Sequence, residues 1–252
     1  MSEEAPTTVG GMIEAVYQRF DNATLSYGHG TDNPWDEAVY LVLGVTGCAD
    51  DEASLRLPVS SAERERIKAL AGRRVDERAP LAHLLGECQF MGQRFFVEPG
   101  VMVPRSPIGY LLGEPLSDWI APGITRIVDL CAGVGCLGIL AAQRYPMSRV
   151  TLVELEPQAA ALARKNVALH NLGERVEVIQ GDACQWLAGE TGQWDLILTN
   201  PPYVNVADMQ TLPEEYRHEP ELGLAAGADG LALVDAFLPE LAAHLKPNGA
   251  FL

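Results

Sequence analysis

Short apolar runs alternate with helical segments from Thr125 onward, and this alternation constrains the fold more than any other feature. The expected strands are Arg126–Cys131, Arg149–Glu154, Arg175–Gln180, Trp194–Thr199 and Gly249–Leu252, and the expected helices are Cys136–Arg144, Pro157–His170, Ala183–Leu187 and Leu231–Leu245. Strands separated by helices predict an α/β fold with a doubly wound, mostly parallel sheet. The sequence ends within the last expected strand, so we expect the C-terminal part of the sheet to be truncated.

The first third of the chain has a different pattern. Apolar residues at helical spacing predict helices at Val9–Phe20, from Asn33-Pro34 to Gly44 or Gly47, from Glu63 to Leu70 with a stop at Gly72, and at Arg78–Gly86. We therefore expect a small helical domain over residues 1–86. Residues 87–122 are expected to form a linker, with a hairpin around Gly92 and a helix over Ile108–Ile120. The α/β domain is expected to cover residues 123–252.

Composition narrows the class of protein. Of the 252 residues, 48% are hydrophobic, which supports a packed core, and no apolar run reaches the roughly 20 residues that span a bilayer. The N-terminus has no secretory apolar region, so we expect a soluble, cytoplasmic protein. The five cysteines form no Cys-x-x-Cys pair, so we expect reduced thiols and no metal site. A net charge of −16 disfavours direct nucleic-acid binding and fits a small molecule or a basic protein partner.

The expected strand Trp194–Thr199 is followed by Asn200-Pro201-Pro202-Tyr203. Two prolines cannot continue a central strand, so this tetrapeptide is expected at the carboxyl end of the strand, the sheet edge where α/β proteins bind ligands. A stiff turn holds the Asn200 amide and the neighbouring carbonyl in one geometry. Such a carbonyl pair suits a planar NH2 group, although an ordinary proline-terminated strand is the alternative.

Three more motifs follow earlier strands. Asp129, Ala132, Gly133 and Gly135 belong to a strand, glycine loop and helix start, where glycines allow a ligand to approach the backbone. Glu154 ends the next expected strand and suits the two hydroxyls of a ribose, or is a capping or surface acid. Asp182, followed by Ala183, suits an adenine amino group, caps the short helix, or does both.

These motifs, in this order at four successive strand ends, resemble the class I S-adenosylmethionine-dependent methyltransferases, which have a Rossmann-like fold. Asn-Pro-Pro-Tyr is similar to the motif of members that methylate amino or amide nitrogens. The stretches 103–109, 212–224 and 227–231 resemble the protein-glutamine methyltransferases. Within that family, Pro104-Arg-Ser-Pro107 and Tyr216-Arg-His-Glu-Pro220 resemble the branch that acts on the third large-subunit ribosomal protein. The sister branch, which acts on peptide release factors, usually has Pro-Arg-Pro-x-Thr-Glu at the first of these positions.

The resemblance implies the reaction and the site. It implies transfer of a methyl group from S-adenosylmethionine to the side-chain amide of a glutamine in a ribosomal protein, with S-adenosyl-L-homocysteine as product. The residues that it implies are a catalytic set (Asn200, Pro201, Pro202, Tyr203), a cofactor set (Asp129, Ala132, Gly133, Gly135, Glu154, Asp182, Ala183, Asn200) and a substrate set (Pro104, Arg105, Asn200, Tyr203). No general base is implied, and His218 is expected to be structural. By position and analogy, residues 1–86 are expected to recognise the substrate.

The sequence departs from the family pattern at a few positions. Tyr110 stands where the branch usually has Glu, Ala132-Gly-Val-Gly135 stands where Thr-Gly-Ser-Gly is usual, and Glu154 replaces Asp. The alternatives are methylation of release factors, a nucleic-acid adenine methyltransferase, a nicotinamide oxidoreductase and a non-catalytic cofactor-binding partner. The acidic composition disfavours the nucleic-acid enzyme. The oxidoreductase is disfavoured because Ile139 stands where the dinucleotide fingerprint has its third glycine.

Overall fold

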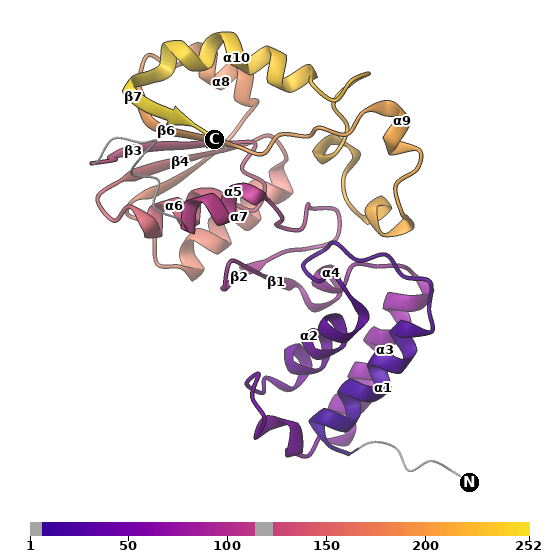
Figure 1. The fold of residues 1–252 in the computed structure, drawn as a ribbon. Coiled ribbons are helices and arrows are strands. Elements are labelled where there is room, and N and C mark those ends of the chain that lie inside the picture. The colour runs from indigo at the N-terminus through magenta and orange to yellow at the C-terminus, as the bar shows by residue number, and fades with distance from the viewer. Residues whose placement is uncertain (1–6, 114–122) are drawn as a thin grey trace. The chain divides into compact units, whose positions relative to one another are not determined.

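A computed structural model describes residues 7–113 and 123–252 and divides the chain into two compact units (Figure 1). The helical unit holds the residues up to Glu87 together with Pro213–His218. The α/β unit holds Cys88–Leu212 and Glu219–Leu252. A short segment from the second half of the sequence therefore belongs to the helical unit, which the expected domain boundaries of 86 and 122 did not include. Among the described residues, no helix is long and apolar enough to cross a membrane.

The helical unit is built on amphipathic helices with capped starts. Its elements are α1 (Val9–Asp21), α2 (Pro34–Thr46), η1 (Ser54–Arg56), α3 (Ser61–Asp76) and α4 (Leu81–Leu85). The side chains of Thr8, Asn33 and Ser60 accept backbone N–H groups at the starts of α1, α2 and α3, and Ser60 completes a capping box with Glu63. Such caps each stabilise a helix by about 1 kcal/mol. They fix where the helices begin, close to where the sequence predicted them.

The prediction that α3 stops at Gly72 is wrong, because the helix continues to Asp76. A glycine inside a helix costs only about 1 kcal/mol relative to alanine. The residues after it offset that cost: Arg73 pairs with Glu77 one turn later at 3.0 Å, and Arg74 is buried in an ion-pair cluster. The contacts of these two arginines therefore extend α3 beyond Gly72. Helix propensity alone does not include such contacts.

Apolar side chains from each of these four helices form the core of the helical unit. The buried members are Val9, Met12, Ile13, Val16, Phe20, Ala38, Leu41, Val42, Val59, Ile67, Ala71 and Leu81. They recur at the spacing of one helical face, so burying them brings α1, α2 and α3 together. Burial of this face explains why apolar residues recur at helical spacing in this part of the sequence.

A buried ion-pair cluster joins Pro213–His218 to the rest of the helical unit. Arg74 is 1% exposed, and its Nε donates to both carboxylate oxygens of Glu37 at 3.1 Å. Its Nη1 donates to Glu215 Oε1 at 3.1 Å, and Arg78 Nη1 donates to the same oxygen at 3.2 Å. Burial raises the pKa of Glu37, which Arg74 opposes by stabilising the ionised form. Glu215 is thus the partner of two arginines that lie 141 and 137 residues away in sequence.

The α/β unit contains the predicted sheet. Within the described residues, β3 (Arg126–Leu130), β4 (Arg149–Glu154), β5 (Val176–Gln180), β6 (Trp194–Thr199) and β7 (Leu245–Phe251) form a five-stranded sheet in the order β5-β4-β3-β6-β7. All neighbouring pairs are parallel, which confirms the predicted doubly wound α/β class. The chain moves outward from β3 to β5 and then returns to the other side of β3. The point between β3 and β6 is therefore the switch point at which such sheets bind ligands.

Helices cover both faces of this sheet. Figure 1 shows α6 (Cys136–Arg144) and α7 (Pro157–Leu169) on one face, and α8 (Ala183–Gly189) and α10 (Ala232–His244) on the other. Helices α8 and α10 pack on the sheet through a core that includes Val128, Val153, Leu187, Trp194 and Phe237. Burial on both faces explains why the strands read as continuous apolar runs.

Some predicted boundaries differ from the structure. Strand β7 begins at Leu245, and not at Gly249, with a register irregularity between Trp194 and Leu196 of its neighbour β6. The Pro247-Asn-Gly249 sequence reads as a turn, and it falls within this irregularity, because the pairing with β6 passes from Leu245 to Ala250 and Asn248 has a left-handed φ of +66°. The predicted hairpin around Gly92 is present as β1 (Glu87–Phe90) and β2 (Gln93–Phe96).

Helix α5 spans Pro107–Gly113, and the remainder of the helix predicted to Ile120 lies outside the described residues. Between β6 and α10 the chain forms three short elements that the sequence did not predict. They are α9 (Val206–Met209), η3 (Glu214–His218) and η4 (Glu221–Gly223).

Replacing Glu215 is expected to destabilise the helical unit. Glu215→Gln removes one of the two carboxylates that neutralise the buried Arg74, and breaking a buried pair in this way costs about 3 kcal/mol in the free energy of unfolding. Urea denaturation followed by circular dichroism measures the change. Glu214→Gln is the matched control, because Glu214 is 58% exposed and its contact with Arg78 is 3.6 Å. Equal losses in the two variants would contradict a special role for the buried pair.

Candidate active site

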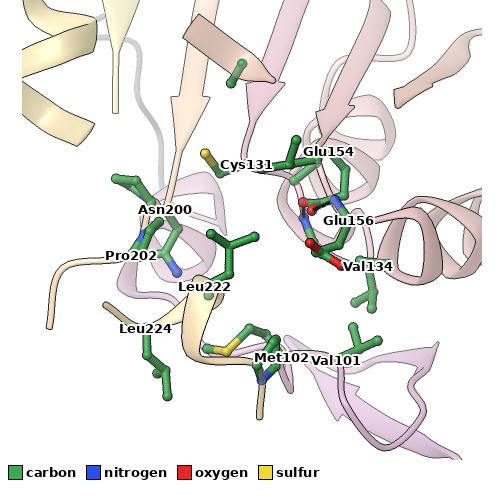
Figure 2. A pocket seen from close by; sticks show the side chains of 18 of the residues that line it. Val101, Met102, Cys131, Val134, Glu154, Glu156, Asn200, Pro202, Leu222 and Leu224 are labelled. Carbon is green, nitrogen blue, oxygen red and sulfur yellow. Dashed lines mark hydrogen bonds between the residues drawn. The ribbon is translucent and has the colours of Figure 1, made fainter. Parts of the chain in front are cut away.

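The carboxyl ends of β3, β4 and β6 open onto one cavity of about 220 Å³, all of whose lining residues belong to the α/β unit (Figure 2). Nearly all the residues singled out in the sequence line it: Pro104, Arg105, Asp129, Ala132, Gly133, Glu154, Asp182, Ala183, Asn200, Pro201, Pro202 and Tyr203. Gly135 does not line the cavity. It caps the start of α6, where an added Cβ would lie 2.9 Å from Leu152, so its role there is close packing of the loop.

The glycine loop curls because several residues take left-handed backbone conformations. Cys131, Gly133 and Gly135 have φ values of +57°, +56° and +85°. Cys131 is the unusual one, since a Cβ disfavours this region. Burial raises the pKa of its thiol to about 12, so the thiol stays protonated, and Cys131 lines the cavity as a small apolar side chain. All five cysteines are free.

The loop keeps its shape without the hydroxyl groups that the family pattern usually has. Asn166, which is fully buried, donates from Nδ2 to the carbonyl of Val134 at 3.0 Å and to that of Phe96 at 3.1 Å. Its Oδ1 accepts the N–H of Phe96 at 2.7 Å. The N–H of Ala132 donates to Val153 O at 3.1 Å. Helix α7 and strand β4 therefore hold the Ala132-Gly-Val-Gly135 loop through its backbone.

Asp129 is a buried acid at the base of the cavity. It is 1% exposed, and its Oδ2 accepts the N–H of Gly138 at 2.8 Å, an approach that a side chain at residue 138 would block. Its Oδ1 has no hydrogen-bond partner among the described residues. Burial raises the pKa of Asp129 to about 7, the Gly138 N–H opposes that rise, and the nearby Glu154 carboxylate adds to it. The unpartnered oxygen is a vacant acceptor for a cation or a donor.

Glu154 is held in place by the backbone at the end of β4. Its Oε2 accepts the N–H of Gly133 at 2.7 Å, and its Oε1 accepts the N–H of Glu156 at 2.8 Å. Burial raises the pKa of Glu154, which these two N–H groups oppose. Each carboxylate oxygen can accept a further hydrogen bond. Glu154 is thus neither a helix cap nor a surface acid, and it faces the cavity with fixed geometry.

Asp182 caps a helix and also lines the cavity. Its Oδ1 accepts the N–H of Gln185 at 2.8 Å and caps α8, which confirms the predicted N-cap. Within the described part of the chain, its Oδ2 makes no hydrogen bond, and the residue lines the cavity. One oxygen therefore fixes the side chain, and the other is available to a ligand.

Asn200-Pro-Pro-Tyr203 leaves β6 at the cavity, as predicted. Thr199 Oγ1 donates to the carbonyl of Leu130 at 2.8 Å, which fixes the end of β6 against β3. No hydrogen bond of the Asn200 amide occurs in the described part of the chain, and Tyr203 is 64% exposed. Just beyond, Val204 forms a parallel bridge with Ala225, so the motif is fixed at both ends.

Arg105 is fixed by an ion pair that the sequence did not reveal. Its Nη1 and Nη2 donate to the two carboxylate oxygens of Glu219 at 2.7 and 2.6 Å.

His218, expected to be structural, belongs to the helical unit, where its Nε2 lies 2.8 Å from the carbonyl of Glu77. Sequence reasoning also missed the cavity residues Met102 and Leu222, which carry no chemical group that marks a site. The described residues hold no cluster of three or more metal-ligating side chains.

Comparisons with known proteins give the family. A family model described as "Methyltransferase small domain" matches residues 116–215. The ribosomal protein uL3 glutamine methyltransferase of Bordetella pertussis is 42% identical over 249 residues, which cover 97% of this chain and 83% of the relative. The protein of the same name from Neisseria gonorrhoeae is 39% identical over 250 residues, covering 98% and 83%. The chain belongs to this family of glutamine methyltransferases.

Among solved structures, the chain is similar to the 16S rRNA N2 G1207 methyltransferase of T. thermophilus, at 26% identity and a TM-score of 0.47 over 66% of this chain and 40% of that one. The relatives confirm the predicted protein-glutamine methyltransferase family and the branch within it.

Asp129 is expected to make stability depend on pH. Its folded-state pKa of about 7 lies above its ordinary value of 3.8, so its stabilising contribution is complete below pH 3.8 and is lost as the pH rises through 7. Asp129→Asn removes this dependence, and its stability relative to wild type should rise between pH 5 and pH 8, by at most roughly 3 kcal/mol. Denaturant unfolding of both proteins across that range measures the difference. A difference that stays constant with pH would contradict the prediction.

Proposed function

We propose that this chain transfers a methyl group from S-adenosylmethionine to the side-chain amide nitrogen of a glutamine in ribosomal protein uL3. The observation that carries the proposal is that Asn200-Pro-Pro-Tyr203 opens onto the same cavity as the fixed acids Glu154 and Asp182. The names of the relatives support both the reaction and the substrate. The reaction is proposed to take place in the cytoplasm, because its substrate is a ribosomal protein.

The cavity suits S-adenosylmethionine, which is cationic and carries ribose hydroxyls and an adenine amino group. The unpartnered, buried Oδ1 of Asp129 suits the positively charged part of this cofactor. At Gly133 nothing lies within 4 Å of the position that a Cβ would take, so a ligand has room beside the loop. The residues proposed to hold the cofactor are Asp129, Ala132, Gly133, Glu154, Asp182, Ala183 and Asn200, and Gly135 is proposed to act only through the shape of the loop. When bound, S-adenosylmethionine supplies an electrophilic methyl group and leaves as S-adenosyl-L-homocysteine.

Glu154 and Asp182 are proposed to orient the two halves of the adenosine. The remaining lone pairs of Glu154 accept the ribose hydroxyls, and Oδ2 of Asp182 accepts the adenine amino group. Because backbone N–H groups already fix one direction at each carboxylate, binding orders few side chains. Little conformational entropy is lost in this way, which is the benefit of a preorganised site.

Asn200 and the backbone carbonyl of Pro201 are proposed to accept the two N–H groups of the target amide. An amide nitrogen is a poor nucleophile, since its lone pair is delocalised into the carbonyl. Two acceptors direct that lone pair toward the reaction axis, and positioning of this kind can supply about 7–11 kcal/mol. Pro202 is proposed to stiffen the turn, and the exposed ring of Tyr203 is proposed to pack over the amide and near the sulfonium of the cofactor, with which a cation–π contact contributes about 0.5–2 kcal/mol. The product loses its proton to water.

The protein substrate is proposed to bind through complementary charge and through the helical unit. A chain with a net charge of −16 attracts a basic ribosomal protein over a distance. Pro104 and Arg105 at the cavity are proposed to contact the substrate. Arg105 would do so through guanidinium N–H groups that do not bind Glu219. The helical unit is proposed to recognise the rest of the substrate.

Asn200→Ala is expected to cost far more rate than Tyr203→Phe. The alanine removes an acceptor that orients the nucleophile, for which a loss of about 100-fold is expected. The phenylalanine keeps the ring and its cation–π contact, so a loss below about tenfold is expected. Single-turnover methyl transfer measures both, and calorimetry of S-adenosylmethionine binding identifies a variant that fails only to bind cofactor. Comparable losses in the two variants would contradict the assigned roles.

The proposed function is tested by the intact mass of candidate substrates after incubation with the chain and S-adenosylmethionine. A gain of one methyl group on uL3, and none on a class I release factor, is expected. A gain on the release factor alone would favour the sister branch. A methyl group found only on nucleic acid, with neither protein modified, would overturn the proposal.

A further inference from the structure

Two chain segments that are far apart in sequence form one wall of the cavity. Residues 100–106 come from the linker, and residues 219–224 come from the segment after the Asn-Pro-Pro-Tyr motif. All of the first segment lines the cavity, and from the second segment Pro220, Leu222, Gly223 and Leu224 line it. They pack closely, since a Cβ on Gly223 would lie 2.7 Å from Met102 Cγ and 2.9 Å from its sulfur. Figure 2 shows Val101, Met102, Leu222 and Leu224 of these two segments together. We call them the linker–η4 wall.

Glu219 joins the two segments of the linker–η4 wall. Its side chain is fully buried, with 0% exposure. It accepts the N–H of Val103 at 2.9 Å and the two guanidinium nitrogens of Arg105 at 2.7 and 2.6 Å. Hydrogen bonds between ionised groups are shorter and stronger than neutral ones, and the two parallel bonds to Arg105 fix direction as well as distance.

Leu222 lies between two fixed points of this wall. On one side is Glu219, and on the other is Leu224, which is 5% exposed and whose carbonyl accepts the N–H of Val204 at 2.8 Å. The short turn η4 between them closes with the N–H of Gly223 donating to Pro220 O at 2.9 Å. Leu222 is nevertheless 51% exposed. A turn that is fixed at both ends thus presents a bare leucine side chain to the cavity.

The surroundings of Leu222 indicate what it contacts. Figure 2 draws its side chain inside the cavity, with Asn200 and Pro202 on one side and Glu154 and Glu156 on the other. A glutamine whose amide is held at Asn200 has two apolar methylene groups directly behind that amide. Those methylenes need an apolar surface close to Asn200, and Leu222 provides one.

We propose that Leu222 is the contact for the aliphatic part of the target glutamine, and that Glu219 is a positioning residue that acts through Leu222. The inference rests on the proposed function and adds to it a residue that selects the length of the methylated side chain. An asparagine, one methylene shorter, cannot reach the Asn200 acceptors from the same backbone position while packing on Leu222. A single methylene of this kind discriminates by about 10- to 200-fold.

The test is a double-variant cycle measured on methyl transfer to uL3. Leu222→Ala is expected to raise the KM for the protein substrate roughly tenfold, and to leave the affinity for S-adenosylmethionine within about twofold. Glu219→Gln is expected to raise the same KM. Because Glu219 acts through Leu222, the double variant should be no worse than Leu222→Ala alone, since residues that share one effect are not additive. Glu221→Gln, an exposed acid on the same turn, is the matched control and should behave like wild type.

The outcomes separate this inference from the proposed function. If the wild-type chain methylates uL3 and both variants keep its KM, the inference is overturned alone. It is also overturned if Glu219→Gln only lowers the melting temperature, because Glu219 is then a structural brace, or if the two effects simply add. Failure of the wild-type chain to methylate uL3, with cofactor binding intact in calorimetry, contradicts the proposed function and the inference with it.

Discussion

The parallel register around β3 determines which residues meet in the cavity. Leu130, the last residue of β3, pairs with Val153 on one side and with Thr199 on the other. The next residue along each strand, which is Cys131, Glu154 or Asn200, therefore lies at the same level of the sheet. Parallel strands point their carboxyl ends in one direction, so a shift of one residue in either pairing would move an acid or the amide away from the cavity.

Buried carboxylates hold the functional segments of this acidic chain. Asp129, Glu154 and Glu219 each accept at least one backbone N–H, and Glu215 accepts the N–H of Ser26 at 2.9 Å. An unpaired buried charge is costly, so each of these acids is tied to a definite partner. Asp129 and Glu154, at the strand ends, shape the cavity. Glu215 and Glu219 both follow Asn-Pro-Pro-Tyr in sequence, but Glu215 fixes its part of the segment in the helical unit and Glu219 fixes its part in the α/β unit.

The fold and most of the cavity could be predicted from the sequence, because both depend on local patterns. Apolar runs gave the strands, and Asp182 and Ser60 marked helix starts by their position alone. The pairings of Arg105 with Glu219 and of Arg74 with Glu215 could not be predicted, since 114 and 141 residues separate the partners. One sequence contains no signal that matches a particular arginine with a particular acid across such distances.

The course of the chain through its two units has a consequence for how this protein can be divided. The helical unit is discontinuous, because Pro213–His218 belongs to it while the residues on both sides belong to the α/β unit. Cutting the chain after Glu87 would not release a complete helical module, since Arg74 would lose Glu215. Recombination at that boundary would therefore have to exchange two pieces together. The segment that carries Glu215 is expected to diversify along with the helices, and not with the methyltransferase sheet that surrounds it in sequence.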